Sequence, residues 1–265
     1  MRSESLRNIW MLSKKNMTLY VKRGPVLIFG LMFPFFLVIS WILGRTISIN
    51  QIFIGIVAMT SFFTSTAISP VILPIETREK SLERLLSAPV SFNEILLGII
   101  IASTLYSIII TSIISIIFIL LFPTLIASPF SYIIIFIGIS LMGVLGSLLG
   151  LLVSSKPTDM TSDIMVLMNL IKFPLLFIGG VFIPLSSLPS SIAILYFFSP
   201  LTFVTEMLRS SVDQTNLLSN EVSILFLIGW IALFLTLNYV LHRKTMPKRF
   251  SEAASGPKMK TVRKK

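Results

Sequence analysis

Cysteine is absent from this chain of 265 residues, histidine occurs once, as His242, and only 12% of the residues are charged. Without cysteine the chain can form no disulfide and offers no thiolate nucleophile or metal ligand. A single imidazole cannot build a histidine metal cluster within one chain. So little charge is atypical of a soluble domain, whose surface must face water. The composition therefore excludes a disulfide scaffold and thiol chemistry.

Motifs for familiar catalytic chemistry are missing as well. The sequence holds no phosphate-binding G-x-x-x-x-G-K-[ST] loop, no H-E-x-x-H zinc motif and no G-x-S-x-G nucleophile turn. None of its 11 acidic residues falls deep inside a predicted span, where proton- and sodium-coupled carriers usually place carboxylates. We therefore expect no ATPase site and no cofactor in this chain. The energy source for any transport is expected in another polypeptide.

Apolar sequence is what the chain has in abundance: 54% of the residues are hydrophobic, and the mean hydropathy is +0.92. A bilayer core about 30 Å thick needs roughly 20 apolar residues per helix. A spanning segment must be helical, because lipid offers no partners to an open backbone. We predict an all-α integral membrane protein whose permease-like domain, residues 25–241, has six transmembrane helices at residues 25–43, 51–75, 95–122, 130–153, 164–183 and 222–241.

The region between the fifth and sixth predicted spans, residues 184–221, has a different character. It is polar and is interrupted by Pro184, Pro189 and Pro200. Its apolar centre, residues 192–198, is too short to cross a bilayer. We expect this region to be re-entrant or to lie on the outer surface.

The basic residues set the predicted orientation. The net charge is +11, which could suggest a nucleic-acid partner, but 19 of the 22 Lys and Arg residues fall in segments on one side of the predicted spans. The other side holds only Arg45 and Arg209. By the positive-inside rule we expect both termini to be cytoplasmic, and we expect no nucleic-acid partner. The expected location is the cell (plasma) membrane. The basic tail, residues 242–265, is expected to lie near anionic lipid.

Residues 1–24 predict an interfacial amphipathic helix. On a helical projection Leu6, Ile9, Trp10, Met17 and Tyr20 lie on one side, and Arg7, Lys14, Lys15 and Lys22 on the other. The basic side would face anionic headgroups. We do not expect a signal peptide, because the apolar stretch after Pro25 has no small-residue cleavage site and ends at Arg45. A frayed basic leader remains the alternative.

A charged segment lies between the second and third predicted spans. Residues 76–88 predict a short amphipathic helix that Pro89 ends. The side chains of Leu82, Leu85 and Leu86 would form an apolar edge that can enter a partner's cleft. Charged residues would line its rim, and Glu76 and Lys80 have the i,i+4 spacing of a stabilising pair. The alternative is an ordinary solvated loop whose charges only set topology.

Three motifs in this chain resemble those of the ABC type-2 exporter permeases, the membrane subunits of drug and polysaccharide exporters. Residues 79–89 read E-K-S-L-E-R-L-L-S-A-P, similar to the family's [GK]-[TS]-L-E-x-L-L-x-x-P signature, with Lys80 and Ser81 replacing the usual Gly-Thr. Residues 177–184, F-I-G-G-V-F-I-P, and residues 198–203, F-S-P-L-T-F, resemble the end of the family's fifth span and the outer helix before its last span. The resemblance covers essentially the whole chain.

The resemblance implies partners and roles for particular residues. Two copies of the chain would form a homodimer, and a separate nucleotide-binding ATPase subunit would bind ATP and magnesium. A coupling helix would dock on that subunit through Glu76, Glu79, Ser81, Leu82, Glu83, Arg84, Leu85, Leu86 and Pro89. Separately from the resemblance, we expect an outer gate to include Gly179, Gly180, Pro184, Pro200, Glu206 and Arg209; the last two have i,i+3 spacing and could pair, and an exposed pair of this kind would contribute little.

Polar residues inside the predicted spans are candidates for packing or for the transport pathway. Ser103, Ser107 and Thr111 repeat every four residues on the third span, and Thr64 lies on the second; such residues join helices or line a route. Small residues at 143, 146, 147 and 150 favour close helix packing within the subunit over a dimer seam. Lys172 lies well inside the fifth span. Either its stem extends to the inner interface, or its charge binds an anionic cargo or headgroup.

We therefore expect the permease subunit of an ATP-driven exporter. Its apolar, Ser- and Thr-containing spans favour lipophilic or amphipathic cargo. A polysaccharide or lipid-linked glycan is the alternative cargo, although Trp and Tyr, which a sugar route would use, number only 3 and 5. An ATP-independent carrier or channel and an integral membrane enzyme are the alternatives from other classes.

Overall fold

The computed structural model describes residues 2–20, 24, 28–126, 128–187, 189 and 193–254, and all the regular structure in these ranges is helical. The main α-helices are α1 (Arg2–Tyr20), α3 (Phe33–Ile42), α4 (Ile49–Arg78), α5 (Ser81–Ser87), α6 (Phe92–Leu121), α7 (Pro129–Val153), α8 (Thr161–Phe177), α10 (Pro200–Val212) and α11 (Asn220–Ala254). A π-helical turn η1 (Ile28–Met32) leads into α3, and the short 3₁₀ turns are η2 (Pro123–Leu125), η3 (Leu185–Ser187) and η4 (Ile194–Phe198). The predicted all-helical class is confirmed for the described residues.

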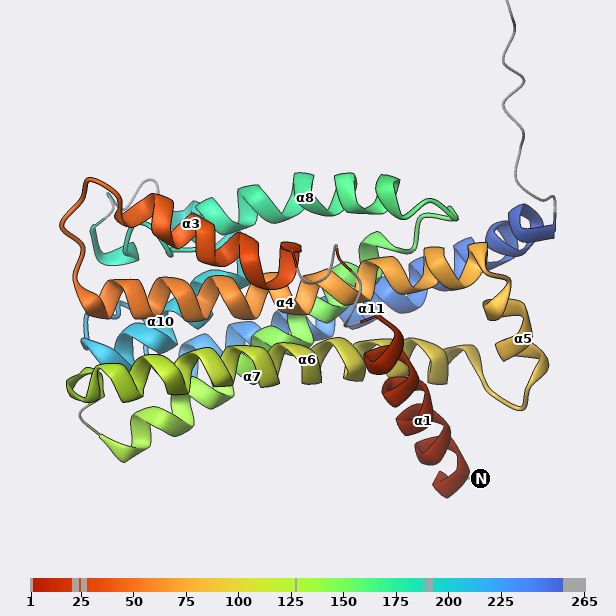
Figure 1. Cartoon of the computed structure of the whole chain (residues 1–265), viewed down its shortest axis with the longest axis horizontal. Helices are drawn as coiled ribbons and strands as arrows, with labels where there is room; N and C mark the ends of the chain where they lie inside the picture. Colours follow the sequence, from red (N-terminus) through yellow and green to blue (C-terminus); the bar gives the residue numbers. More distant parts are fainter. Residues whose placement is uncertain are drawn as a thin grey trace, which may run out of the picture.

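Four helices are long and apolar enough to cross a membrane: α4, α6, α7 and the Asn220–Pro247 part of α11. The predicted spans at 25–43 and 164–183 correspond to shorter helices. The first is an apolar helical stretch, Gly30–Ile42, and residues 25–27 lie outside the described part of the chain. The second is α8, whose 17 residues end at Phe177, before the predicted limit. Both nevertheless run along the long axis of the bundle beside α4 (Figure 1).

Helix α4 is the centre of the bundle. Every residue from Phe53 to Thr77 is buried, and α4 packs against α3, α6, α7, α8 and α10. A helix buried on all sides needs no amphipathic pattern, which is why its sequence mixes apolar residues with Ser and Thr throughout. The other helices of the single chain therefore surround and bury α4 along this length.

Helix α7 approaches α4 closely because it presents glycine there. A Cβ added to Gly146 would meet Ser65 Oγ, and one added to Gly150 would meet Ser69 Oγ and lie 2.8 Å from Pro70 Cδ. The absence of side chains lets the two backbones come together. The predicted role of these small residues in packing within the subunit is confirmed.

Helix α11 packs against α7 and is fixed there by two buried polar side chains. Asn238 Nδ2 donates to the carbonyl oxygen of Leu148 at 2.9 Å, and His242 Nε2 lies 3.0 Å from that of Leu151. The single histidine thus serves helix packing at the end of the last span.

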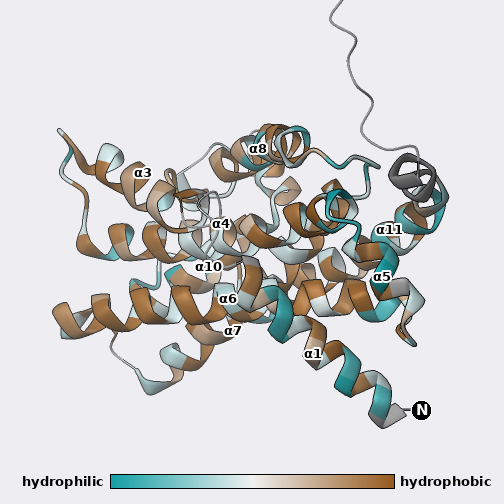
Figure 2. Ribbon diagram, turned by 45° about the vertical axis from the view of Figure 1, so that its right-hand side comes forward, coloured by the Kyte–Doolittle hydropathy of each residue, from teal (hydrophilic) through white to brown (hydrophobic). Residues whose placement is uncertain are grey.

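Polar and apolar surfaces separate along the bundle. Figure 2 shows hydrophobic residues along most of the long helices and hydrophilic residues on α1 and α5, which lie at one end. The loops after α3, α6 and α8 lie at the opposite end, beside α10 (Figure 1). With its 13 residues, α10 is too short to cross a bilayer by itself.

Candidate functional site

The charged segment at 76–89 does not form one helix, so the predicted boundaries were wrong. Helix α4 continues to Arg78, and Lys80 then adopts a left-handed conformation with φ 54° before α5 begins at Ser81. A non-glycine residue with positive φ interrupts the helix. The hydroxyl of Ser81 donates to the carbonyl oxygen of Glu76 at 3.3 Å and closes the turn. The candidate coupling helix is thus α5, turned away from the end of α4.

Two leucines of α5, Leu82 and Leu85, face the protein's own bundle. Leu82 is only 2% exposed and belongs to a buried cluster with Ile72 and Ile75 of α4, and Leu85 packs against the same cluster. Contrary to the prediction, Leu82 is therefore unavailable to a partner's cleft. The side chain of Leu86 lies outside the described part of the structure. The exposed surface around α5 consists instead of Arg78, Glu79, Lys80, Arg84, Ser87, Ala88 and Pro89, with Glu83 partly exposed.

Glu76 is also buried, with 1% of its side chain exposed. Its Oε1 pairs with Nζ of Lys15 on α1 at 2.5 Å, and not with Lys80 as its spacing predicted. A partly buried ion pair of this kind fixes position, because separating it would leave a buried carboxylate without its partner. Glu76 therefore belongs to a contact between α1 and α4 within the chain.

Helix α1 also contacts the C-terminal end of the charged segment at 76–89. Asn8 Nδ2 donates to the carbonyl oxygen of Pro89 at 3.4 Å. The buried side of α1 uses Leu12, Ser13 and Asn16 against α6, and a Cβ on Gly98 would lie 2.7 Å from Leu12 Cβ. On the predicted apolar side of the helix, Leu6 and Trp10 are exposed, by 66% and 59%. Sequence reasoning missed these contacts, because a short polar face gives no periodic signal for long-range packing.

The polar residues of the bundle interior join helices. Thr64 Oγ1 lies 3.1 Å from Ser107 Oγ, which itself donates to the carbonyl oxygen of Ser61 at 2.9 Å. These bonds connect α4 to α6, which favours packing over a pathway for Thr64 and Ser107. Ser103 and Thr111 are equally buried on α6, but their hydroxyls have no hydrogen-bond partner among the described residues.

Lys172 is fully buried on α8 and does not extend to the inner interface, so the snorkelling interpretation is wrong for this structure. Its Nζ lies 4.7 Å from the centroid of the Phe63 ring, a cation–π contact. Phe63 packs with Phe33 and Phe173, which places the ammonium group beside an aromatic cluster shared by α3, α4 and α8. Within the described residues Nζ has no hydrogen-bond partner.

The candidate outer-gate residues are brought together where α8 ends. After Phe177 the backbone turns, with Gly180 at φ +69°, and four side chains from the N-terminal end and one face of α10 point at this turn. The resulting side-chain-to-carbonyl bonds are Ser199 to Leu175 at 2.8 Å, Thr202 to Ile178 at 3.1 Å, Thr205 to Gly179 at 3.0 Å and Arg209 to Gly180 at 2.8 Å. Two of these hydroxyls also lie near a second carbonyl oxygen: that of Thr202 near the carbonyl of Tyr196, and that of Thr205 near the carbonyl of Thr202.

Glu206 and Arg209 are buried, not exposed as expected. Glu206 Oε2 accepts from the backbone N–H groups of Leu217 and Leu218, at 2.6 and 3.1 Å, while its Oε1 lies 3.9 Å from Arg209 Nε. The carboxylate thus holds the loop before α11, and the guanidinium holds the turn after α8. Pro200 begins α10 at its first position, where its missing N–H costs nothing.

The four apolar candidate spans and the charged helix α5 at one end of the bundle define the class: a polytopic, all-helical membrane protein. Residues 7–212 match the family model described as ABC-2 type transporter, and the chain belongs to that family. The family resemblance seen in the motifs is confirmed. No sequence among curated proteins matches the chain. The membrane domain is that of an ABC-type permease, a class whose ATPase is supplied by a partner.

Proposed function

We propose that this chain is the membrane subunit of an ATP-driven exporter in the cell membrane, with both termini cytoplasmic. Membership of the ABC-2 family supports the permease role, and the sequence holds no phosphate-binding loop of its own. Two copies would enclose the pathway, since the single chain is packed solid around α4. In each copy, η1 with α3, and α8, would supply the first and fifth spans beside the four long helices.

The single observation that carries the proposal is the way α5 is attached. Its apolar side is fixed to the end of α4 by Leu82 and by the bond from Ser81 to Glu76, while its charged side, including Arg84, faces outward. A charged docking surface on a firmly attached helix can pass a rigid-body displacement into the bundle. The ATPase would therefore bind the charged side of α5, and a displacement of α5 would be transmitted to α4.

Copurification tests this assignment directly. The tagged chain, extracted from its native membranes in mild detergent, should bring down a stoichiometric soluble ATPase. Arg84→Glu should reduce that recovery, because it reverses a charge on the exposed side of α5. Arg45→Glu is the matched control, an exposed arginine at the opposite end of the bundle. A chain that purifies without an ATPase, even after crosslinking at Ser87, and transport that survives ATP depletion would both support an ATP-independent carrier instead.

For cargo, we favour lipophilic or amphipathic molecules over glycans. The support is the interior chemistry: apolar side chains, a few hydroxyls and the Phe33–Phe63–Phe173 cluster beside Lys172. Proteoliposomes holding the chain with its copurified ATPase should hydrolyse ATP faster when amphipathic drugs or lipids are added. Stimulation by lipid-linked glycans alone would favour the glycan alternative.

A further inference from the structure

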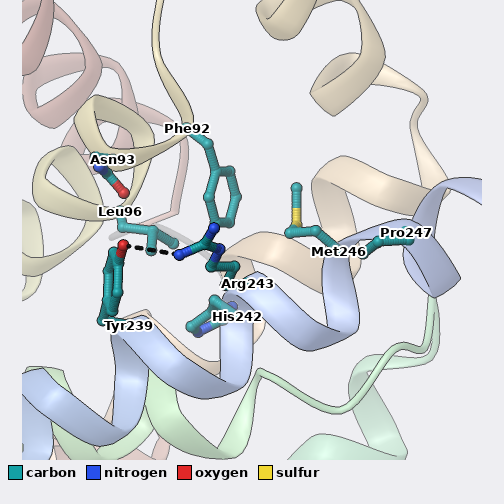
Figure 3. A pocket seen from close by; sticks show the side chains of 8 residues that line it. All are labelled: Phe92, Asn93, Leu96, Tyr239, His242, Arg243, Met246 and Pro247. Atoms are coloured by element: carbon teal, nitrogen blue, oxygen red, sulfur yellow. Dashed lines mark hydrogen bonds between the residues drawn. The ribbon is translucent and has the colours of Figure 1, made fainter.

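A cavity of about 590 Å³ lies between the beginning of α6 and the last turns of α11, at the same end of the bundle as α5. Figure 3 shows it from close by, with Phe92 and Leu96 contributed by α6 and Tyr239, Arg243 and Met246 by α11. It is separate from the outward face of α5 and from the turn after α8. Its volume is in the range of small-molecule binding pockets.

The cavity combines an apolar wall with one cationic group. Phe92, Leu96 and Met246 supply the apolar surface. Arg243 Nη1 lies 3.4 Å from the hydroxyl oxygen of Tyr239, and Figure 3 shows the guanidinium group between Tyr239 and Phe92. No carboxylate pairs with Arg243 among the side chains that the structure describes. A guanidinium group with most of its donors available is suited to binding a phosphate through two hydrogen bonds.

The cavity lies where both helices change from apolar to polar sequence. On α11 the apolar run ends at Leu241 and is followed by a histidine, Arg243 and Lys244; on α6 the apolar run begins at Ile95. This change marks the depth of the lipid headgroups. Next to the cavity-lining residues Leu96 and Tyr239, Leu97 and Val240 are exposed apolar residues. A molecule with its phosphate at Arg243 could thus extend an acyl chain along the apolar wall.

We propose that this cavity binds an anionic phospholipid, its phosphate on Arg243 and its glycerol and upper acyl chain against Phe92, Leu96 and Met246. Basic pockets between membrane helices on the cytoplasmic side are suited to such headgroups. The chain's own tail, residues 255–265, is positively charged, as Arg243 is, so the tail is poorly suited to occupy this cavity. A free anion would leave the apolar wall unused. The assignment to the cytoplasmic leaflet rests on the proposed orientation, whereas binding itself does not.

The test uses the purified full-length chain in delipidated detergent, with bound lipid counted by native mass spectrometry. Phosphatidylglycerol should be retained over phosphatidylcholine of the same acyl chains, and Arg243→Gln should weaken phosphatidylglycerol binding about tenfold or more, the order expected for a charge-assisted hydrogen bond. Lys244→Gln, which removes the same charge one residue further along α11, should keep the wild-type preference. Equal weakening by both variants would overturn the site, because the effect would then be general electrostatics.

A second variant tests the apolar wall. Met246→Trp keeps Arg243 but fills the cavity, and should lower retention of phosphatidylglycerol while the chain elutes unchanged on gel filtration. Wild-type retention in this variant would show that the lipid binds elsewhere. Inorganic phosphate at millimolar concentration should displace little of the bound lipid. Complete displacement would identify a free-anion site and overturn the proposal.

Discussion

The contact between Gly146 on α7 and Ser65 on α4 predicts a specific loss of stability. Replacing Gly146 with alanine would place the new Cβ against Ser65, 2.7 Å from its Cβ and in contact with its Oγ. The Oγ atom could rotate away, at the cost of its bonds to the carbonyl oxygens of Ser61 and Phe62, at 2.7 and 3.0 Å. The Cβ atom is fixed to the backbone and cannot move. The two helices must therefore separate.

The expected magnitude follows from two opposing effects. Overpacking a well-packed interface costs about 1–3 kcal/mol, whereas replacing glycine with alanine within a helix returns up to about 1 kcal/mol. Gly146→Ala should therefore be destabilising, by up to about 2 kcal/mol. Gly229 on α11 is the matched control, since a Cβ there would meet nothing within 4 Å. Gly229→Ala should leave stability unchanged or raise it.

The assay is thermal unfolding of the purified variants in one detergent, followed by tryptophan fluorescence. A double-mutant cycle then isolates the contact. Ser65→Gly removes the clashing Cβ and should recover part of the loss caused by Gly146→Ala, whereas Ser65→Ala, which keeps the Cβ, should recover less. If Gly146→Ala behaves like Gly229→Ala, or if both serine variants rescue it equally, the helices are not held at the distance described here.

Three further contacts give predictions of their own. Lys15→Met should lower the unfolding midpoint, because it leaves the buried Glu76 carboxylate without its cation, and the exchange Lys15→Glu with Glu76→Lys should recover part of the loss. Arg209→Lys should cost about 1–3 kcal/mol, since an ammonium group cannot reach both the Gly180 carbonyl and Glu206, while Arg45→Lys should change nothing measurable. Lys172→Met should raise stability, because it removes a buried amine that has no hydrogen-bond partner among the described residues, and it should slow transport of anionic cargo; unchanged transport of every substrate tested would exclude a cargo role.

The helical class and the family could be predicted from the sequence because both depend on local signals. Long apolar runs predict helices whatever surrounds them, and three motifs in order identify the family. The C-terminal limit of α8 was harder to predict from the sequence. Its apolar run continues past residue 177, but Gly179 and Gly180 form a turn that α10 stabilises through Thr205 and Arg209. That stabilisation comes from residues about 25 to 30 positions away, which no local pattern contains.

Side-chain environments could not be predicted for a related reason. Periodicity indicates that Leu82 and Leu85 lie on one side of a helix, but not whether that side meets a partner, lipid or the chain's own bundle. Here α4 supplies the apolar surface that a partner was expected to provide. Likewise Lys172 lies at a depth from which its side chain could reach the interface, yet its Nζ lies inside the bundle, over the ring of Phe63, which is more than 100 residues earlier in the sequence. Tertiary contacts decide such cases.

The contacts also indicate which parts of the bundle would move together. Helices α4, α6 and α7 are joined by close glycine contacts and by the bonds of Thr64 and Ser107, so a displacement of α5 that reaches α4 must move all three as one body. Helix α8 packs less extensively on α4 and α7, and side-chain bonds from α10 hold its C-terminal end and the turn that follows. A helix held firmly at one end and loosely along its length can pivot about the held end. We therefore expect the turn at Gly179 and Gly180 to be the hinge, and the end of α8 nearest α5 to show the largest movement.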